Sequence, residues 1–326
     1  MTYVNLITGF LGSGKTTTLR HLLSQKPSHE NWAILVNEFG EVGIDGALLA
    51  GQGAELKEIP GGCMCCVNGL PMQIGLNMLL KQKPDRLLIE PTGLGHPKQI
   101  LSLLTAETYQ PWLTLQATLC LLDARQLGEE RYRDNENFRD QLAAADLIIA
   151  NKQDTWQEAD RQRLAAWVAN EAGGRPVIEV QQGEVDAALL ALPRQNLRTL
   201  PDGAHHHGTP AARGLAALSL PGNQRWRRAL SHGQGHSSCG WIFDEETVFD
   251  TIPLMEWARL APVERVKGVL RIAEGTLLLN RQGQDFKIET RPGAPLDSRI
   301  EVITQGEADW NALQSALLKL RLAGDA

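Results

Sequence analysis

The chain has 326 residues, of which 43% are hydrophobic and 21% are charged, and its formal net charge is −6. This is the composition of an ordinary folded protein, and it excludes a disordered, fibrous or coiled-coil chain. The length indicates two domains. The acidic balance leaves no overall surplus of positive charge for a phosphate backbone, so we expect no nucleic-acid partner.

Nothing in the sequence is typical of a membrane or secreted protein. It has no run approaching the roughly 20 apolar residues of a membrane span. Its first residues lack the basic and then apolar pattern of a secretory signal. Three of the five cysteines fall within residues 63–66, unlike the spaced pattern of a disulfide framework. We therefore expect a cytoplasmic protein with no membrane partner.

Up to residue 192, short apolar runs alternate with longer helical patterns. The predicted strands are residues 3–8, 32–37, 86–90, 117–123, 147–150 and 177–180. The predicted helices are residues 16–25, 97–104, 136–145 and 158–172, where apolar residues recur at spacings of three and four. This alternation predicts an α/β domain over residues 1–192 with a doubly wound, mostly parallel sheet. Ligands of such sheets bind beyond the carboxyl ends of the strands.

The pattern breaks at residues 193–214, which are rich in Pro, Gly and polar residues and contain His205, His206 and His207. We interpret this segment as a linker. Beyond it the sequence shows an apolar run at 215–220, a strand-like run at 240–243, four more between 263 and 304, and helical patterns at 247–260 and 307–322. We predict a smaller α+β domain over residues 215–326.

Residues 9–16 read GFLGSGKT and fit the phosphate-binding pattern GxxxxGK[ST], which requires a strand before it and a helix after it. Both are predicted here. The glycines let backbone N–H groups turn toward phosphate oxygens. Lys15 would place positive charge at the β- and γ-phosphates, and the Thr16 hydroxyl would ligate Mg²⁺.

Residues 151–154 read NKQD and follow the predicted strand 147–150. A carboxylate in this position can accept hydrogen bonds from N1–H and the exocyclic amine of guanine. Adenine offers an acceptor at N1 and no amine at C2, so its pairing would leave a polar group unsatisfied at a cost of about 1–3 kcal/mol. The motif therefore predicts GTP as the nucleotide, with about tenfold or greater discrimination.

Residues 87–93 read LLIEPTG, a hydrophobic strand that ends in a carboxylate and is followed by a glycine. This is typical of a Walker B strand and a γ-phosphate sensor. Glu90 would hold Mg²⁺ through water, and Gly93 would donate its N–H to the γ-phosphate. Glu90 could instead orient the attacking water. No glutamine or arginine identifies itself as an accelerator of hydrolysis, so we predict slow intrinsic turnover that awaits a partner or a metal.

Residues 61–66 read GGCMCC and place three sulfurs within four residues. The thiolates of Cys63, Cys65 and Cys66, with one nitrogen or oxygen ligand, would make a tetrahedral Zn²⁺ site if the chain turns there. Cu(I), Co and Ni remain alternatives, as do a redox pair and buried structural cysteines. Cys120 lies in an apolar run, and we expect it in the core.

Other residues with ligand chemistry are less specific. Glu38 and Glu41, in the segment NEFGEVGID, could complete the zinc site, contact Mg²⁺ or be solvated loop carboxylates. A rearrangement of either on hydrolysis would let the nucleotide change the zinc affinity, at about 1.4 kcal/mol for each tenfold change. His96 could face the nucleotide or lie at the surface. The remaining group, in loose spacing, is His232, His236 and Cys239.

The motifs GFLGSGKTT, NEFGEVGID, GGCMCC, LLIEPTGLG and NKQD, in this order, resemble those of the CobW-like, zinc-regulated GTPases. The resemblance covers essentially the whole chain, since the last hundred or so residues resemble the family's C-terminal domain. It places phosphate and Mg²⁺ binding at Gly9, Gly12, Ser13, Gly14, Lys15, Thr16 and Thr17, guanine binding at Asn151, Lys152 and Asp154, and metal binding at Cys63, Cys65, Cys66, Glu38 and Glu41.

The resemblance implies a GTPase that binds zinc and delivers metal to a client metalloprotein. It also implies low basal activity and metal-dependent homo-oligomers. The three linker histidines are a short version of the histidine-rich loops of some relatives, which argues against metal storage. The alternative is a zinc buffer or sensor in which GTP is structural and turnover is negligible. A P-loop kinase is a weaker alternative, because the NKQD motif opposes it.

Overall fold

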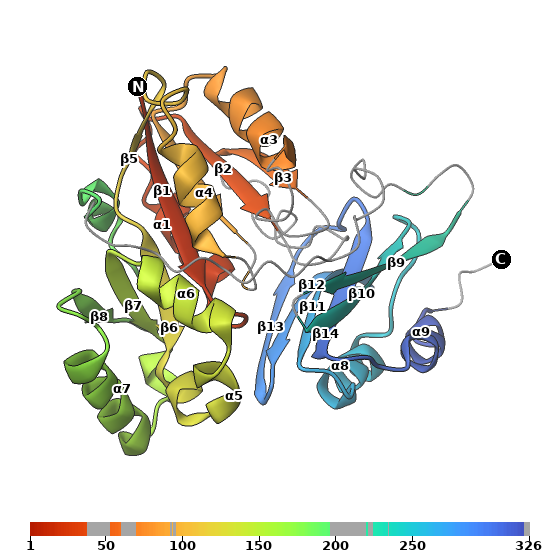
Figure 1. Cartoon of the computed structure of the whole chain (residues 1–326). Coiled ribbons are helices and arrows are strands. Elements are labelled where there is room, and N and C mark those ends of the chain that lie inside the picture. Colours follow the sequence, from red (N-terminus) through yellow and green to blue (C-terminus); the bar gives the residue numbers. More distant parts are fainter. Residues whose placement is uncertain are drawn as a thin grey trace. The chain divides into compact units, whose positions relative to one another are not determined.

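The computed structural model describes residues 1–37, 53–59, 70–91, 93, 96–195, 220, 224–233 and 235–322. The chain divides into two compact units (Figure 1). The described residues up to 195 belong to the first unit, and those from 220 onward belong to the second.

The first unit contains an eight-stranded sheet in the order β3-β2-β4-β1-β6-β7-β8, with β5 beside β1. The strands are β1 (Thr2–Gly9), β2 (Trp32–Asn37), β3 (Glu55–Ile59), β4 (Arg86–Glu90), β5 (Leu113–Leu115), β6 (Leu119–Asp123), β7 (Leu147–Asn151) and β8 (Val177–Glu179). All pairings between these strands are parallel. The chain winds from β1 to one edge, returns through β4 and then builds the other edge. The predicted doubly wound α/β sheet is confirmed.

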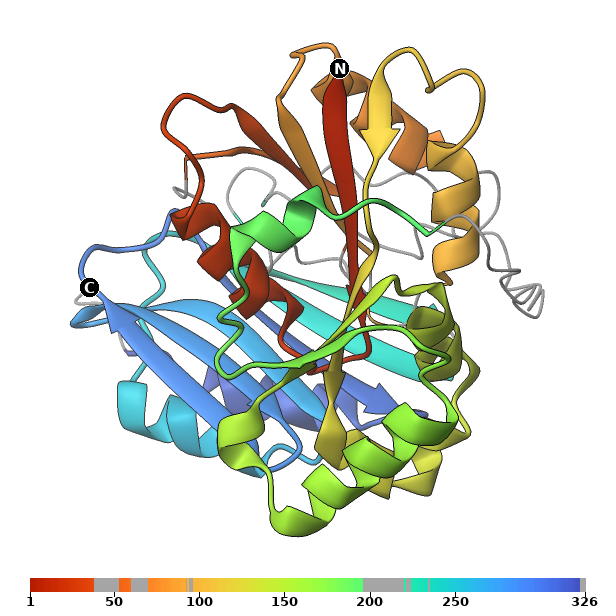
Figure 2. The same ribbon diagram turned by 90° about the vertical axis from the view of Figure 1, so that its left-hand side faces the viewer.

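Helices cover both faces of this sheet, because both faces are apolar. Along β2, Ala33 and Leu35 join one core cluster, while Ile34 and Val36 join the other. The first cluster packs against α3 (Leu70–Leu80) and α4 (Pro97–Leu104), and the second packs against α1 (Lys15–Ser24). Figure 2 shows α1 on one side of the sheet and α3 and α4 on the other. Burial on both faces explains why these strands read as continuous hydrophobic runs.

All six predicted strands and all four predicted helices of the first unit are present. The two remaining predicted helices are α6 (Glu136–Ala144) and α7 (Glu158–Asn170). Among the described α-helices and β-strands of this unit, four were not predicted: β3, β5, α3 and the four-residue α5 (Glu130–Arg133). The sequence of β3 carries three charges, and α3 is apolar on nearly all sides, so neither shows a clear period. Both elements depend on the sheet against which they pack.

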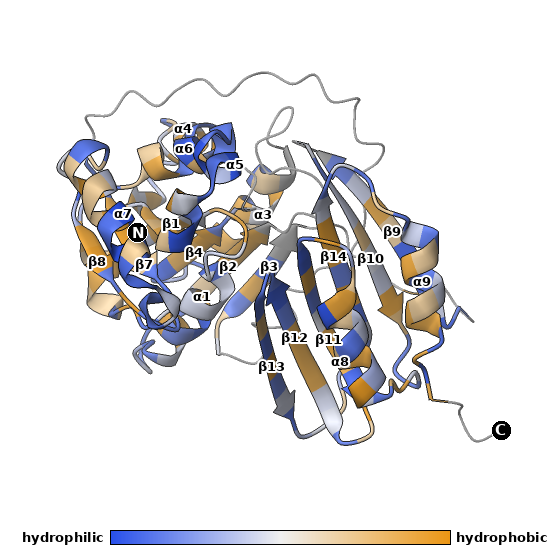
Figure 3. Ribbon diagram, turned by 90° about the horizontal axis from the view of Figure 1, so that it is seen from below, coloured by the Kyte–Doolittle hydropathy of each residue, from blue (hydrophilic) through white to orange (hydrophobic). Residues whose placement is uncertain are grey.

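The second unit is a six-stranded antiparallel sheet in the order β13-β12-β11-β14-β10-β9. The strands are β9 (Trp226–Gly233), β10 (His236–Phe243), β11 (Arg265–Ile272), β12 (Gly275–Gln282), β13 (Asp285–Arg291) and β14 (Ser298–Gln305). Its core contains Trp241 and Phe243 from the sheet and Leu254 and Leu313 from α8 (Thr251–Leu260) and α9 (Trp310–Leu318). Figure 3 shows mostly hydrophilic residues along the edge strand β13, as expected of a strand edge that must not pair with other chains.

The predicted α+β class of the second unit is confirmed, with shorter helices than expected. Phe249 forms isolated β-bridges with Ile272 and Arg321, so α8 begins only after it. The side chain of Asp309 caps α9 by accepting a hydrogen bond from the N–H of Ala312. The domain limits stay a prediction, because most of the proposed linker lies outside the described residues. Across the part of the chain that the structure describes, every helix is too short or too polar to cross a membrane.

We predict that Leu76→Ala, in α3, lowers the free energy of unfolding of the first unit by about 2–5 kcal/mol. Leu76 is fully buried between α3 and the sheet. The matched control is Met78→Ala in the same helix, where the side chain is 48% exposed. Urea denaturation should place this control within about 0.5 kcal/mol of the wild type. Equal losses in the two variants would contradict this packing of α3.

Candidate functional site

The site lies at the carboxyl ends of four neighbouring parallel strands, β4, β1, β6 and β7, which all end on the same side of the sheet. Residues 9–16 connect β1 to α1, as the phosphate-binding pattern requires. The N-terminus of α1 presents backbone N–H groups that have no partner within the helix, which favours an anion there. Glu90 is the last residue of β4, and Asp123 pairs in register with Asn151 at the ends of β6 and β7. Parallel pairing therefore brings the separate motifs together.

At two positions of the site, neighbouring atoms come so close to the backbone that only glycine fits. Gly14 caps α1 with φ of 101°, and a Cβ there would lie 2.3 Å from Nδ2 of Asn151. A Cβ on Gly93 would lie 2.8 Å from the backbone nitrogen of Leu11 and 3.1 Å from Nζ of Lys15. Gly93 thus lies directly against the phosphate loop (residues 9–16), where the sequence places a γ-phosphate sensor.

Lys15 is held inside the phosphate loop. Its ammonium donates hydrogen bonds to the carbonyl oxygens of Gly9 at 2.8 Å and Phe10 at 3.4 Å, and the residue is 7% exposed. The ring of Phe10 packs edge-on against those of Tyr132 and Phe138, with centroids 5.6 and 5.8 Å away. These contacts keep the loop folded and hold a positive charge at its centre.

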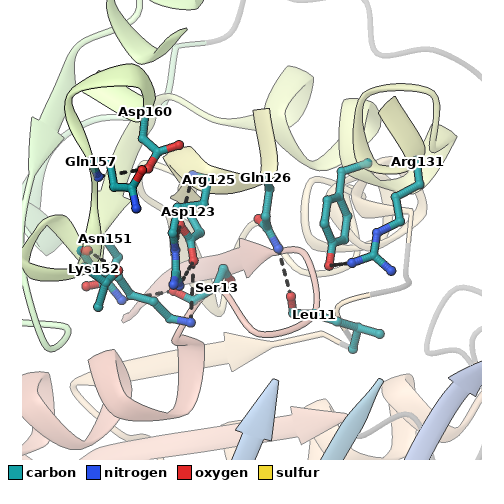
Figure 4. A network of polar contacts seen from close by, with 12 residues as sticks. Leu11, Ser13, Asp123, Arg125, Gln126, Arg131, Asn151, Lys152, Gln157 and Asp160 are labelled. Atoms are coloured by element: carbon teal, nitrogen blue, oxygen red, sulfur yellow. Dashed lines mark hydrogen bonds and ion pairs between the residues drawn. The ribbon is translucent and has the colours of Figure 1, made fainter. Parts of the chain in front are cut away.

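Asn151 joins two loops of the site. Its amide nitrogen donates to the carbonyl of Ser13 at 3.0 Å, and its amide oxygen accepts from the N–H of Gly183 at 3.0 Å. Figure 4 shows this side chain beside Ser13. Asn151 is 1% exposed, so in this structure it connects the phosphate loop to the segment after β8. The sequence did not predict this connecting contact.

Lys152 and Asp154 extend from the same turn. Lys152 has a left-handed backbone with φ of 66°, and its ammonium lies 3.5 Å from the carboxylate of Asp123 (Figure 4). Asp123 is 3% exposed and also accepts from the guanidinium of Arg125 at 2.6 Å. Asp154 is exposed and accepts from Gln182 at 2.7 Å. Asp154 is therefore accessible to a ligand, whereas Asn151 is not.

Three polar residues of the site were missed in the sequence: Asp123, Gln126 and Gln141. Gln126 donates to the carbonyl of Leu11 at 3.1 Å (Figure 4), and Gln141 contacts both Gly9 and Gly93. Asp123 carried a partial signal, since it is a carboxylate at the end of the hydrophobic run 117–123, but the pairing of that strand with β1 is visible only in the structure. The glutamines carried none, because each contacts backbone that is distant in the sequence.

The two predicted magnesium ligands occupy suitable elements. Glu90 is 2% exposed at the end of β4, and Thr16 lies in the first turn of α1. A hydroxyl and a carboxylate supply the oxygen ligands that Mg²⁺ prefers. His96 precedes α4, and its Nδ1 lies 2.7 Å from a carboxylate oxygen of Asp140, so it is paired with α6.

The predicted zinc ligands Cys63, Cys65, Cys66, Glu38 and Glu41 lie outside the described residues, as do His205, His206 and His207. Where the chain is described, no group of three or more His, Cys, Asp or Glu residues is arranged to hold a metal ion. His232, His236 and Cys239 are among the described residues and form no such group.

The other two cysteines are core residues. Cys120 is 1% exposed in β6, as predicted, and Cys239 is fully buried in the core of the second unit. Burial raises the pKa of Cys120 to about 11 and that of Cys239 to about 12. Both thiols are therefore protonated at neutral pH, and a protonated thiol is a poor metal ligand.

Comparison with known proteins identifies the family of the chain. The family "CobW/HypB/UreG, nucleotide-binding domain" matches residues 3–179, and "Cobalamin synthesis protein cobW C-terminal domain" matches residues 238–321. The chain belongs to the CobW/HypB/UreG family. It is 67% identical over 328 residues to the zinc chaperone YeiR of Escherichia coli (strain K12), with 100% of each chain covered.

Similarity to other members is lower. The zinc chaperone YjiA of Escherichia coli (strain K12) is 34% identical over 196 residues, which cover 57% of this chain and 60% of that protein. The crystal structure of Zn(II)-bound YjiA GTPase from E. coli aligns with a TM-score of 0.46 and 22% identity, over 98% of this chain and 99% of that chain.

We predict that Asn151→Ala destabilises the nucleotide-free protein by about 1–3 kcal/mol, because the Ser13 carbonyl and the Gly183 N–H both lose their partner. Asp154→Ala is the matched control from the same motif. Its side chain is exposed, so its loss should stay within about 0.5 kcal/mol. Thermal unfolding without nucleotide tests the pair. If Asn151→Ala proved as mild as the control, the connecting role of Asn151 would be wrong.

Proposed function

We propose that this protein is a zinc-binding GTPase that acts as a metallochaperone and couples GTP hydrolysis to the transfer of zinc to a client metalloprotein. The observation that carries the proposal is the position of Gly93. It lies against Lys15 and the phosphate loop, so the segment after the Walker B strand is next to the site for the terminal phosphate. The zinc chaperone names of the similar proteins support the metal part of the proposal.

We assign the phosphates to residues 9–17. In the nucleotide complex Lys15 would exchange its carbonyl contacts for β- and γ-phosphate oxygens, which gain more from a full positive charge than neutral carbonyls do. The phosphate-binding group is Gly9, Gly12, Ser13, Gly14, Lys15, Thr16 and Thr17, with the Gly93 N–H at the γ-phosphate.

We assign the guanine to Asp154, because its carboxylate is exposed and therefore accessible to the base. Asn151 would support this pocket from beneath by holding the phosphate loop. Lys152, oriented by Asp123, would lie between the base and the phosphates. This arrangement favours GTP and GDP over adenine nucleotides.

Thr16 and Glu90 would hold Mg²⁺, Thr16 directly and Glu90 through water. Bound Mg²⁺ would supply charge neutralisation at the β- and γ-phosphates. With Lys15 they form the catalytic group that we propose.

We propose a slow intrinsic rate of hydrolysis. Three described glutamine and arginine side chains near the phosphate loop already make hydrogen bonds within the protein. Gln126 and Gln141 bond to backbone groups, and Arg125 bonds to Asp123. A faster rate would need a partner or a metal that supplies or releases such a group.

We propose that zinc, the cargo, binds to the thiolates of Cys63, Cys65 and Cys66, with Glu38 and Glu41 as oxygen ligands. The cysteine motif stands between the phosphate loop and Glu90 in the chain, so the two predicted sites alternate along one stretch of sequence. Release of the ion then requires that the nucleotide state changes its affinity.

The remaining roles that we propose concern the rest of the chain and its partners. The domains would span residues 1–192 and 215–326, joined by the linker 193–214. The second would recognise the client metalloprotein. We further propose that the protein works in the cytoplasm and forms metal-dependent homo-oligomers.

We expect GTP hydrolysis in the presence of Mg²⁺, with ATP turned over at least about tenfold less efficiently. Phosphate release from both nucleotides measures this preference, and Lys15→Ala is the control that removes the charge at the β- and γ-phosphates. Asp154→Ala should weaken the preference for GTP, because guanine loses its carboxylate partner. No release above that of Lys15→Ala would refute hydrolysis.

We expect zinc to bind at least about tenfold more weakly in one nucleotide state than in the other, a difference of about 1.4 kcal/mol. Competition with a chromophoric chelator, with GDP or a non-hydrolysable GTP analogue present, measures it. The triple variant Cys63→Ala, Cys65→Ala, Cys66→Ala should lose the site, whereas Cys120→Ala should keep it.

The outcomes separate the two functions. If the triple variant holds zinc as tightly as the wild type, the proposed zinc site at the three cysteines is wrong. Equal zinc affinity with GDP and with the analogue would instead support the zinc buffer or sensor with structural GTP.

A further inference from the structure

Gln141, on α6, contacts two loops of the nucleotide site with one side chain. Its amide oxygen accepts from the N–H of Gly9 at 2.8 Å, and its amide nitrogen donates to the carbonyl of Gly93 at 2.7 Å. The residue is 1% exposed, so water does not compete with these bonds. Only one orientation of an amide gives an oxygen to an N–H and a nitrogen to a carbonyl at these two places. The contacts thus specify glutamine chemistry and not merely a polar residue.

The neighbouring residue of α6 holds the other end of the same segment. Asp140 contacts Nδ1 of His96 at 2.7 Å, and His96 directly precedes α4. Consecutive residues of α6 therefore hold both Gly93 and His96, two described residues of the segment between β4 and α4. A displacement of Gly93 would act on α6 and, through His96, on the start of α4.

The two backbone groups that Gln141 contacts both belong to residues beside the ammonium of Lys15. The carbonyl of Gly9 accepts from the ammonium of Lys15 at 2.8 Å, and a Cβ on Gly93 would lie 3.1 Å from that same nitrogen. The positive charge, the first glycine of the phosphate loop, Gln141 and Gly93 are consecutive neighbours. If Lys15 moved to bind a γ-phosphate, the surroundings of Gly9 and of Gly93 would both change, and Gln141 is bonded to both.

We propose that Gln141 is a positioning residue that couples the phosphate loop to the Gly93 segment, so that the presence of the γ-phosphate is transmitted to α4 and α6. This inference rests on the proposed GTP site. Gln141 touches no nucleotide itself: it holds the Gly93 peptide at the distance from Lys15 at which the Gly93 N–H can meet the γ-phosphate.

The test is Gln141→Met, a variant of similar length that neither donates nor accepts at these two positions. We expect the ratio of affinities for a non-hydrolysable GTP analogue and GDP to shift by about tenfold toward GDP, because one bond to a buried backbone group is lost in the γ-phosphate sensor. The kcat for GTP should fall by about tenfold or more, and KM should rise by about the factor by which the affinity for the analogue falls, since KM approximates the dissociation constant when turnover is slow.

The matched comparison is Gln126→Met. Gln126 is also a buried glutamine bonded to the phosphate loop, through the carbonyl of Leu11, but it has no hydrogen bond to Gly93 among the described contacts. A loss of stability of the same order is expected in both variants. The shift of the affinity ratio should be at least about threefold larger in Gln141→Met, because only that variant disconnects the sensor.

A second variant adds a readout that a purely structural role would not move. In Gln141→Glu, an ionised carboxylate still accepts from Gly9 but cannot donate to Gly93. The protonated acid can do both. Burial raises the pKa of such a carboxyl group and the ammonium of Lys15, beside Gly9 and Gly93, lowers it. The ratio of affinities for the analogue and GDP in Gln141→Glu should therefore approach the wild-type ratio at the same pH as the pH falls from about 8 to about 6.

The outcomes distinguish this inference from the proposed function. A wild type that releases no phosphate, yet prefers the analogue to GDP and loses this preference in Gln141→Met, would refute hydrolysis and support the coupling. A Gln141→Met protein with an unchanged affinity ratio and kcat would overturn the coupling and leave hydrolysis standing. If Gln141→Met does not fold, Gln141→Glu decides: a ratio that is independent of pH relative to the wild type overturns the inference.

Discussion

Parallel pairing of β1 with β4 on one side and with β6 on the other is the constraint on which the site depends. Parallel neighbours end at the same edge of a sheet, so the loops that follow them must share one small region. This places Gly93 against Lys15 although β2, β3, α3 and β4 stand between them in the chain. An antiparallel strand in the middle of this sheet would send one motif to the opposite edge.

The loops gathered at this edge are held together largely by neutral amides. Asn151, Gln126 and Gln141 each bond to the backbone of the phosphate loop or of the segment at Gly93. An amide offers both a donor and an acceptor, so it can satisfy backbone groups of either kind. It also carries no charge, whereas a carboxylate in the same place would repel phosphate. Neutral connections therefore suit a site that must accept an anion.

The charged groups are arranged differently. Asp123, the buried carboxylate between the phosphate loop and the NKQD turn, is compensated by Arg125 and Lys152. Such pairing keeps its negative charge from acting at the phosphate site. The thiols follow a similar division. Cys120 and Cys239 are buried and protonated, so their sulfurs serve packing and not metal binding.

The amino-acid sequence by itself determined the phosphate loop, the NKQD turn, the strands β2 and β4 and the helix α4. These features are local: each depends on residues within one element or one turn, and their spacing is visible in the chain. Cys120 was likewise placed in the core by the apolar run around it.

Only the tertiary structure decided the roles of Gln141, Gln126 and Asp123, and the connecting contacts of Asn151. The two residues joined by the hydrogen bond from Gly9 to Gln141 lie 132 positions apart, and those joined by the bond from Asn151 to Ser13 lie 138 apart. The edge strand β3 and the helix α3 belong here too, since their own sequences lack a clear period. Contacts of this kind depend on which strands pair and which faces become buried, and no spacing along the chain records that.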